Sequence, residues 1–395
     1  MKIIFVSPSI SRLYTGVYDV EKNLALEFMK KHFKVEVHGM YDEFTNQDLP
    51  NWLPIEPVIY MPYGPKKIGF NPFFLINLIK SKADVGHIHA LWSFTAFALF
   101  LWSKINRKPY VLSVNAYLFK SALNQSRMIK NVALFVGIKK TIKSASCIHV
   151  NTENEYRAVR DLGYTNPITI IPNGVRLPDL SIEFGRAPWN SYIKTKDKRI
   201  LLYLSRVHPQ KGVDLLVNAW KELSDSGLLQ NWHLVIVGLK NDNSRFENSI
   251  LDLVEFNNLH ESITLLPGQF DKYMNNCYSN CDAYVLPSFN EGTSIAALNA
   301  LAFSKPTLIT RGCNISKIFE NDCAIEIEPL TESIKIGIIT LINMNDEDRK
   351  VLGSKGREFV EMNYSWETVS SKILEVYLWL KGHEVTCVPN SVCID

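Results

Sequence analysis

An acidic residue and an amide lie eight positions apart around the start of an apolar helix in "PSFNEGTSIAALNALA", residues 287–302. Glu291 stands before the predicted helix, and Asn299 lies about two turns inside it, roughly 9–12 Å further along the axis. The backbone N–H groups at a helix start carry partial positive charge, so this helix start predicts an anion site. Gly292, Thr293 and Ser294 are expected to supply these amides, and Ser294 or Thr293 is expected near the helix cap.

Two cations follow the first predicted strand of the second half, in "LSRVHPQKGVDLL". Arg206 and Lys211 leave the end of this strand, and a helix begins after Gly212. Paired cations at this position suit a pyrophosphate, because both donate charge-assisted hydrogen bonds to its oxygens. The alternative is an exposed loop whose charges bind no ligand. The spacing of Glu291 and Asn299 resembles the span from a sugar ring to a ribose across a diphosphate, which makes a nucleotide sugar the expected ligand.

Short apolar runs alternate with helical periods along the chain. They run from "KIIFVSP" to "ITIIPNG" in the first half and from "RILLYLSRV" to "PTLITRG" in the second. This alternation predicts an α/β fold class with two open, doubly wound parallel sheets. Ligands bind beyond the carboxyl ends of such strands, so the cleft between the domains is the expected site. The expected organisation is a domain over 1–175, a linker over 176–198, a domain over 199–365, and a helix over 366–382 that returns to the first domain.

Composition sets the expected class and location of the protein. A chain of 395 residues, 46% apolar and 21% charged, is long enough for two cores. Its start reads as a buried strand rather than a signal peptide, and its longest apolar run, 90–102, is too short to cross a bilayer. Seven cysteines in irregular positions fit a reducing compartment, so a cytoplasmic location is predicted. The tail "TCVPNSVCID" shows no period and is expected to be loose.

Basic residues gather in the first half of the chain. Residues 1–175 hold 21 Lys and Arg against 12 Asp and Glu, and no acid lies between Asp84 and Glu153. This block predicts a surface that meets the acidic lipids of the inner membrane face or a phosphate-bearing acceptor, and its alternative is a solvated face of ordinary helices. Nucleic acid is not an expected partner, because the rest of the chain is not basic and no recognition motif accompanies the block. The block consists of Lys104, Arg107, Lys108, Lys120, Arg127, Lys130, Lys139, Lys140 and Lys143.

The chain resembles the retaining glycosyltransferases of family 4, which have the GT-B fold. The resemblance rests on an ordered set of motifs over nearly the whole length: "PSISRLYTGVYD", "HIHALWS", "TIIPNGV", "LSRVHPQKG", "LVIVG", "PSFNEG" and "YSWETVSSKILEVYLWL". It implies transfer of a hexose, with retention, from a nucleotide diphosphate sugar to a hydroxyl of a glycan or lipid-linked glycan. By the frequency of donors in the family, we expect a uridine diphosphate sugar and a role in surface-polysaccharide biosynthesis.

The resemblance also implies roles for the donor-side residues. In the family, the cations matching Arg206 and Lys211 stabilise the diphosphate leaving group, and the acid matching Glu291 lies beside the donor sugar. Gly238, in "LVIVG", is expected on the donor side. The family's second acid holds the ribose hydroxyls, but this chain has Asn299 there. Exchanging a charge-assisted bond for a neutral one costs roughly 1–2 kcal/mol, so we expect donor binding weakened about ten-fold rather than an inactive enzyme.

The acceptor side departs from the family pattern at two places. Asn115 stands where members often have a His near the 6-hydroxyl of the sugar. Thr15-Gly16 replaces a Gly-Gly pair, so Gly16 alone can allow a close backbone approach to a phosphate or acceptor. His89, in "HIHALWS", is a candidate for the acceptor side, or else a structural hydrogen-bonding group.

No metal and no other cofactor is expected, because the resemblance assigns charge stabilisation to side chains. The Asp-x-Asp at Asp346 and Asp348 falls at a predicted helix start, where acids complement the helix dipole. Neither half carries G-x-G-x-x-G after its first strand, which argues against a dinucleotide dehydrogenase. Two alternatives stay open: a sugar-nucleotide epimerase of the same architecture, and a non-catalytic GT-B homologue that binds a partner.

Overall fold

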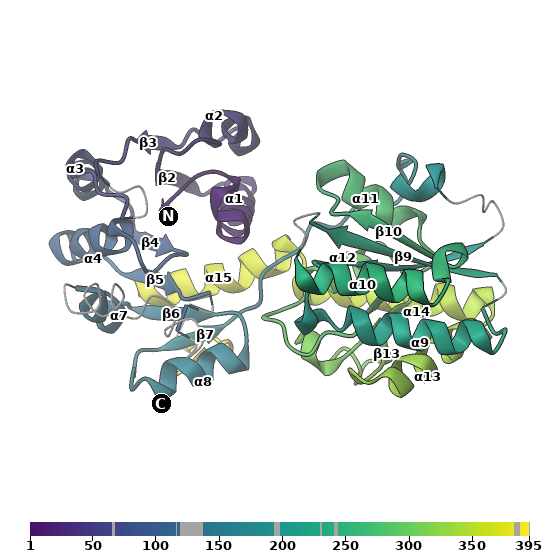
Figure 1. Ribbon diagram of the computed structural model, residues 1–395. Coiled ribbons are helices and arrows are strands. Elements are labelled where there is room, and N and C mark those ends of the chain that lie inside the picture. The colour runs from purple at the N-terminus through teal and green to yellow at the C-terminus, as the bar shows by residue number, and fades with distance from the viewer. Residues whose placement is uncertain are drawn as a thin grey trace. The chain divides into compact units, whose positions relative to one another are not determined.

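The computed structural model describes residues 1–64, 68–115, 117–118, 137–192, 198–229, 231–240, 244–382 and 388–394. The chain forms two compact units. Unit 1 is Met1–Gly174 together with Trp366–Asp395, and unit 2 is Val175–Ser365 (Figure 1). Each unit is built on its own largely parallel sheet with helices on both faces. The predicted α/β class with two doubly wound sheets is therefore confirmed.

Within the described residues, the sheet of unit 1 has eight strands in the order β14-β7-β6-β5-β4-β1-β2-β3. All neighbours pair in parallel except β14, which runs antiparallel to β7. The central strands are continuous apolar runs because helices cover both of their faces. The strands are β1 (Lys2–Ser7), β2 (Lys34–Met40), β3 (Val58–Tyr60), β4 (Val85–Ile88), β5 (Tyr110–Ser113), β6 (Cys147–Val150), β7 (Ile168–Ile170) and β14 (Val392–Cys393).

Helices α3, α4, α7 and α8 cover one face of this sheet, while α1 and α15 cover the other (Figure 1). The long apolar run of the sequence becomes α4, whose Ala96, Leu99 and Trp102 pack in the core. Among the helices of the described ranges, none is long and apolar enough to cross a membrane. The helices are α1 (Thr15–Lys30), α2 (Thr45–Asp48), α3 (Pro72–Lys80), α4 (Phe94–Asn106), α7 (Lys139–Ser144), α8 (Glu153–Asp161) and α15 (Trp366–Lys381).

The C-terminal tail is not loose at its described end, so the prediction for this segment is wrong there. Val392 pairs with Thr169, and Cys393 pairs with Ile168, which makes β14 an edge strand of the sheet. An edge strand offers unpaired N–H and C=O groups that a neighbouring segment can satisfy. The tail is therefore ordered by its partner and not by a periodic pattern of its own.

In the part of unit 2 that the structure describes, the sheet has six parallel strands in the order β10-β9-β8-β11-β12-β13. The predicted linker, 176–198, contributes Ala187 and Trp189 to the core of this unit. The strands are β8 (Arg199–Leu204), β9 (Trp232–Leu239), β10 (Ile263–Pro267), β11 (Ala283–Leu286), β12 (Thr307–Ile309) and β13 (Ile325–Glu326). The helices are α9 (Val213–Asp225), α10 (Arg245–Phe256), α11 (Asp271–Asn280), α12 (Ile295–Ala302), α13 (Thr331–Asn343) and α14 (Asp346–Tyr364).

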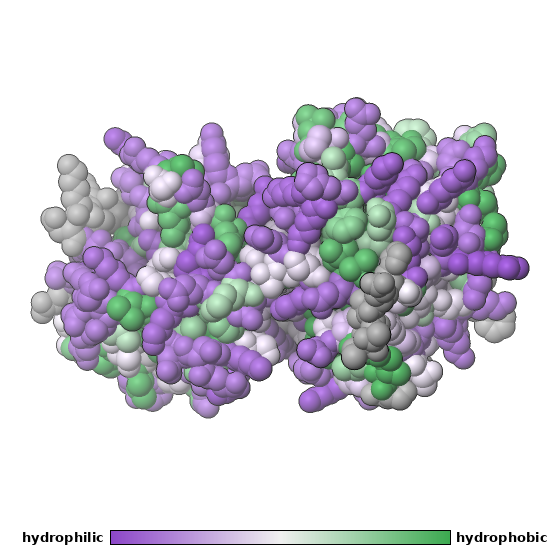
Figure 2. Space-filling view, turned by 180° about the vertical axis from the view of Figure 1, so that it is seen from behind, coloured by the Kyte–Doolittle hydropathy of each residue, from purple (hydrophilic) through white to green (hydrophobic). Residues whose placement is uncertain are grey.

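The face of the molecule drawn in Figure 2 is mainly hydrophilic, and its hydrophobic residues form small separate groups.

The short strands β3 and β13 were not predicted, because runs of three and two residues are too short to show a period.

Candidate active site

The chain reverses its direction across the sheet of unit 2 between β8 and β11. From β8 it proceeds to β9 and β10 on one side, and from β11 it proceeds to β12 and β13 on the other. Parallel sheets bind ligands at the carboxyl ends of the strands on either side of such a change of direction. The loop after β8 carries Arg206 and Lys211, and the loop after β11 carries Glu291.

The Lys211 ammonium forms an ion pair with the Glu291 carboxylate across this point. The two side chains are 11% and 12% exposed, so water screens their charges poorly. Backbone contacts tie the loops together, since the Gln210 carbonyl accepts from the Phe289 N–H at 2.9 Å and from the Ser288 hydroxyl at 3.1 Å. The pair is thus held by the loops and not only by its own attraction.

Two glycines let these segments approach so closely. Gly212 has φ +66°, and a Cβ there would lie 2.3 Å from the Pro287 carbonyl oxygen. Gly238, at φ +144°, would place a Cβ 1.8 Å from the Ser205 carbonyl oxygen. Both positions combine a positive φ with no room for a side chain. Gly238 therefore supports the loop that carries Arg206.

A third loop, after β12, holds the backbone around Glu291. The Glu291 N–H donates to the Gly312 carbonyl at 2.8 Å, and the Ser294 N–H donates to the Cys313 carbonyl at 3.0 Å. The Asn314 side-chain amide donates to the Glu291 carbonyl at 2.5 Å. Asn314 was missed by sequence reasoning, because no motif connects it with Glu291.

These contacts correct one part of the expected anion site. The Ser294 amide is not free, since the Cys313 carbonyl already accepts its hydrogen. The Ser294 hydroxyl instead caps α12 by accepting from the Ala297 N–H at 3.4 Å. Across the described residues, the amides of Gly292 and Thr293 donate to no backbone carbonyl, so these two remain candidates for binding an anion.

Arg206 and Tyr203 complete the surroundings of the ion pair. Arg206 is exposed and, within the described ranges, takes part in no ion pair, so its guanidinium can bind an incoming anion. Burial, with Glu291 nearby, raises the pKa of Tyr203 well above its usual value. The neutral Tyr203 hydroxyl donates to the Arg206 carbonyl at 3.2 Å, which fixes the backbone at this cation. Sequence reasoning missed Tyr203, because it lies within a buried strand.

Asn299 lies on α12 and contacts the interior of unit 2. Its side-chain amide hydrogen-bonds the hydroxyl of Tyr278, a buried residue of α11. The Tyr278 hydroxyl donates its own hydrogen to the Ala296 carbonyl at 3.0 Å. The Tyr278 oxygen can also accept a hydrogen bond, which an amide can donate and an ionised carboxylate cannot.

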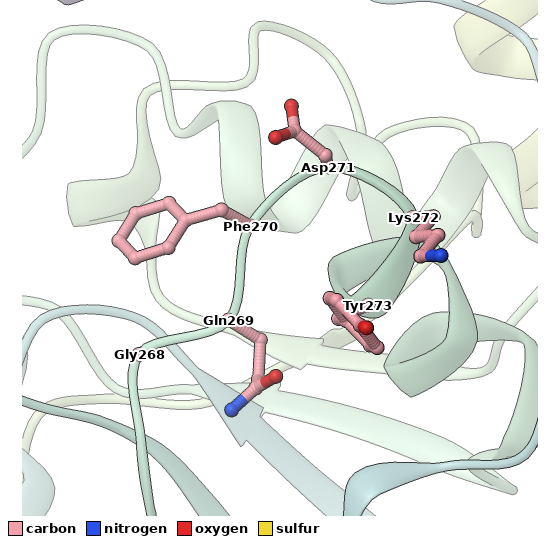
Figure 3. A pocket seen from close by; sticks show the side chains of 6 residues that line it. All are labelled: Gly268, Gln269, Phe270, Asp271, Lys272 and Tyr273. Atoms are coloured by element: carbon pink, nitrogen blue, oxygen red, sulfur yellow. The ribbon is translucent and has the colours of Figure 1, made fainter.

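A pocket of about 500 Å³ opens in the turn after β10, at the carboxyl ends of the strands, where the loops after β8 and β11 also lie. It is lined by Gly268, Gln269, Phe270, Asp271, Lys272 and Tyr273. In Figure 3 the Phe270 ring and the Asp271 carboxylate point outward from the turn, while Gln269 and Tyr273 lie on its inner side. The rings of Phe270 and Tyr273 are both exposed, so the turn offers aromatic surface next to an amide group.

In unit 1, a chain of hydrogen bonds links α15 to the centre of the sheet. The Ile171 carbonyl can only accept, so His149 Nε2 carries a proton and donates to it at 2.7 Å. In the neutral ring the other nitrogen, Nδ1, then accepts from the Ser113 hydroxyl at 2.7 Å. The Ser113 oxygen then accepts from His87 Nε2 at 2.7 Å, and His87 Nδ1 accepts from the Tyr377 hydroxyl at 2.5 Å. Both imidazoles are neutral in this arrangement.

Burial lowers the pKa of His149 to about 4 and lowers the pKa values of His87 and His89 well below their usual value. Nitrogen atoms of the three rings lie within 4.8 Å of one another, close enough to share a metal ion. Both nitrogens of His87 and of His149 are already engaged in the chain of hydrogen bonds, which favours a structural role for these two rings.

The acceptor-side candidates of the sequence fall into two places in unit 1. His89 is fully buried against the His87 ring, and its carbonyl accepts from the Asn115 side-chain amide at 2.8 Å. Asn115 Oδ1 in turn accepts from Asn151 at 3.2 Å. Gly16 is exposed in the first turn of α1, and a Cβ there would meet nothing within 4 Å. The structure thus joins His89 with Asn115 but, within the described residues, shows no contact of either with Gly16.

The remaining charged candidates are placed as follows. Asp346 and Asp348 lie in the first turn of α14, where Asp346 pairs with Arg199 and Arg349. Of the basic block, Lys120, Arg127 and Lys130 lie outside the described residues. The members of the block that lie within the described residues are Lys104, Arg107, Lys108, Lys139, Lys140 and Lys143.

Sequence comparison places both units among enzymes that transfer sugars. The profile described as Glycosyltransferase Family 4 matches residues 14–178, and that described as Glycosyl transferases group 1 matches residues 190–359. An uncharacterized glycosyltransferase of Methanocaldococcus jannaschii is 26% identical over 95% of this chain and 98% of its own length. A lipopolysaccharide 1,2-N-acetylglucosaminetransferase of Salmonella typhimurium is 27% identical over 53% of this chain, and the match spans 55% of that enzyme.

A solved structure has the same fold. The HepE protein of Anabaena, crystallised with UDP and glucose, superposes with a TM-score of 0.69. The alignment covers 95% of this chain and 99% of that protein at 15% identity. At this identity the likeness concerns the arrangement of the strands and helices.

Proposed function

Because this chain belongs to the glycosyltransferases of group 1 and family 4, we propose that it moves a hexose from a uridine diphosphate sugar to a hydroxyl of a glycan or lipid-linked glycan. The transfer retains the configuration at the anomeric carbon and needs no metal ion. The observation that carries the proposal is the Lys211–Glu291 pair beside the exposed Arg206, at the point where the sheet of unit 2 changes direction.

The cations act on the leaving group. As the bond between the anomeric carbon and the diphosphate oxygen breaks, its electron pair leaves with the diphosphate. The Arg206 guanidinium and the Lys211 ammonium offset this growing negative charge, and stabilisation of this kind is usually the largest single contribution to catalysis. The acceptor oxygen bonds to the anomeric carbon, and its proton passes to the departing phosphate oxygen, so no side chain is needed as a base.

Glu291 has two tasks in this scheme. In the free protein its carboxylate neutralises Lys211, which would otherwise be a poorly solvated charge. A bound diphosphate competes for that ammonium and releases the carboxylate to accept hydrogen bonds from sugar hydroxyls. The amides of Gly292 and Thr293 lie next to Glu291 in the chain and can donate to the diphosphate.

The pocket after β10 suits the nucleobase. Neighbouring strands lie about 4.8 Å apart, and β9 separates β8 from β10, so this turn lies roughly 10 Å from the loop of Arg206. A nucleoside spans a comparable length. The Tyr273 ring, on the same inner side of the turn as Gln269, offers a surface for stacking, and the Gln269 amide can both donate to and accept from a base edge.

Two relatives support the choice of substrates. HepE was crystallised with UDP and glucose, which supports a uridine diphosphate sugar. The Salmonella relative acts in making lipopolysaccharide, which supports a surface-glycan acceptor.

The test combines binding with turnover. We expect a panel of nucleotide sugars to raise the thermal unfolding midpoint of the full chain, with uridine diphosphate sugars giving the largest rise. Slow release of UDP from the best donor should speed up when a glycan acceptor is added, and Glu291→Ala should abolish it. An equilibrium between two nucleotide sugars without UDP release would identify an epimerase instead. The absence of both turnover and stabilisation would contradict the proposal.

A further inference from the structure

Six large hydrophobic side chains lie exposed along the edge of unit 1 formed by α3 and the turn before it. Their exposed fractions run from 45% to 60%. The Tyr63 N–H donates to the Phe70 carbonyl at 2.8 Å, and the Asn71 amide donates to the Met61 carbonyl at 2.7 Å, so the turn folds against the start of α3. The six residues, called the α3 ridge below, are Met61, Tyr63, Ile68, Phe70, Phe73 and Ile76.

Helix α3 is apolar on both of its sides. Phe74 and Leu78 are buried in the core against the sheet. Phe73 and Ile76 lie on the opposite side, three residues apart, where a helix on a protein surface ordinarily carries polar residues. Exposed apolar residues gathered in this way mark a surface that binds a protein or a membrane.

Cations flank the ridge at the far end of α3. Helices α3 and α4 lie side by side, and the Asn106 amide donates to the Ile79 carbonyl at 3.1 Å, which joins their C-terminal ends. Four exposed basic side chains follow at these ends, with Lys80 on the same stripe of α3 as Phe73 and Ile76. They are Lys80, Lys82, Lys104 and Arg107.

Acidic side chains do not balance these cations. Residues 57–152 contain a single acid, Asp84. Its carboxylate accepts from the Lys2 N–H at 2.8 Å and pairs with Lys381 at 3.3 Å and Lys108 at 3.9 Å. Glu36, from β2, also reaches this end of α3, where it accepts from the Ser81 hydroxyl at 2.5 Å and pairs with Lys2 at 2.5 Å. Both of these acids are therefore engaged, which leaves the surface beside the ridge cationic.

We propose that the α3 ridge and its flanking cations dock on an anionic phospholipid bilayer. The ridge side chains enter the interface between headgroups and acyl chains, and the four cations contact the phosphates. A second copy of this chain fits the surface less well, because a two-fold contact would bring like charges together. The proposal does not depend on the sugar transfer proposed above.

The test is sedimentation of the full chain with vesicles. We expect binding to vesicles of phosphatidylglycerol mixed with phosphatidylcholine, little binding to phosphatidylcholine alone, and release at about 1 M NaCl, where the screening length falls to roughly 3 Å. The double variant Phe73→Ser/Ile76→Ser should lower the partition coefficient at least ten-fold. The charge-reversing variant Lys80→Glu/Lys104→Glu should lower it by a similar factor.

Matched variants on unit 2 serve as controls. Phe256→Ser/Leu330→Ser removes two hydrophobic side chains that are 88% and 56% exposed, and Lys350→Glu/Lys355→Glu reverses two exposed charges. These controls should bind vesicles as the unchanged protein does, and all variants should keep its thermal midpoint. Equal binding to neutral vesicles, or no loss in the ridge variant, would overturn the proposal.

Two further readouts distinguish membrane binding from self-association and test it separately from the sugar transfer. If the unchanged protein self-associates without lipid and Phe73→Ser/Ile76→Ser makes it monomeric, the ridge is a contact between copies and the proposal is overturned. The ridge variant should also release UDP from a donor sugar at the unchanged rate with a water-soluble acceptor. If vesicles bind but no UDP is released by any form, the sugar-transfer proposal fails while the membrane proposal stands.

Discussion

The Lys211 ammonium and the Glu291 carboxylate meet although 80 positions separate them in the chain. Their loops leave neighbouring parallel strands at the point where the chain changes direction across the sheet. The pair therefore keeps a cation and an acid at one place, with little water, before any ligand arrives.

Breaking this pair should reduce both activity and stability. In Glu291→Gln, Lys211 keeps its charge without a partner, so we expect unfolding to cost about 2 kcal/mol less. Turnover should fall about 100-fold. Urea unfolding and UDP release measure the two effects. As a control, Lys221→Gln removes a pair with Asp225 whose side chains are 40% and 66% exposed, and it should change stability by less than about 1 kcal/mol.

Asn314 positions the backbone of Glu291. Replacing it by Gly removes the hydrogen bond to the Glu291 carbonyl but suits the positive φ of 51° at this position. We expect kcat to fall about ten-fold and the Kd for UDP to rise by a smaller factor, because the loop carries the carboxylate and the amides of Gly292 and Thr293, while the phosphate-binding cations lie on another loop. Asn258→Gly, at a residue with a similar φ of 53°, is the matched control and should leave kcat unchanged. A drop of kcat in both variants would refute the role of Asn314.

Asn299→Glu tests the ribose assignment. A carboxylate can accept from both ribose hydroxyls, so UDP should bind up to about ten-fold more tightly in calorimetry. The variant should also lose some stability, because the introduced carboxylate has no amide hydrogen to donate to Tyr278. Tyr278→Phe removes the internal partner alone and should leave the Kd unchanged. An unaltered Kd in Asn299→Glu would show that this position does not contact the ribose.

Glu21 should make the protein less stable at alkaline pH. Burial raises the pKa of this carboxyl to about 8, so the folded chain keeps a proton that the unfolded chain releases above about pH 4.5. Stability is therefore lost as pH rises from the unfolded pKa towards 8, by about 1 kcal/mol between pH 7 and 8. Urea unfolding followed by circular dichroism should show this decline, and Glu21→Gln should flatten it. Parallel curves for the two proteins would contradict this origin.

His149 should make the protein less stable at acidic pH. Burial lowers its pKa to about 4, so the unfolded chain binds a proton below pH 6.5 that the folded chain does not. The contribution of His149 to the free energy of unfolding is complete above pH 6.5 and is lost as pH falls toward 4, by roughly 3 kcal/mol in total. His149→Gln should make this loss smaller in urea unfolding at pH 7 and pH 5. His260→Gln, at an exposed side chain, should keep the slope of the unchanged protein.

The sequence alone determined the α/β class and most of the strands, because apolar runs and helical periods are local patterns. It also placed Arg206, Lys211 and Glu291 at the ends of strands, where parallel sheets bind ligands. The cap at Ser294 was likewise predictable, since a helix cap depends on residues within one turn.

Only the tertiary structure decided which of these groups meet. The Lys211–Glu291 pair, the engagement of the Ser294 amide by Cys313, and the support from Asn314 all join loops that follow different strands. The order of strands brings those loops together, and no local pattern encodes that order. Strand β14 and the ridge on α3 have the same origin, because an edge partner and an uncovered helix face exist only after the sheet has formed.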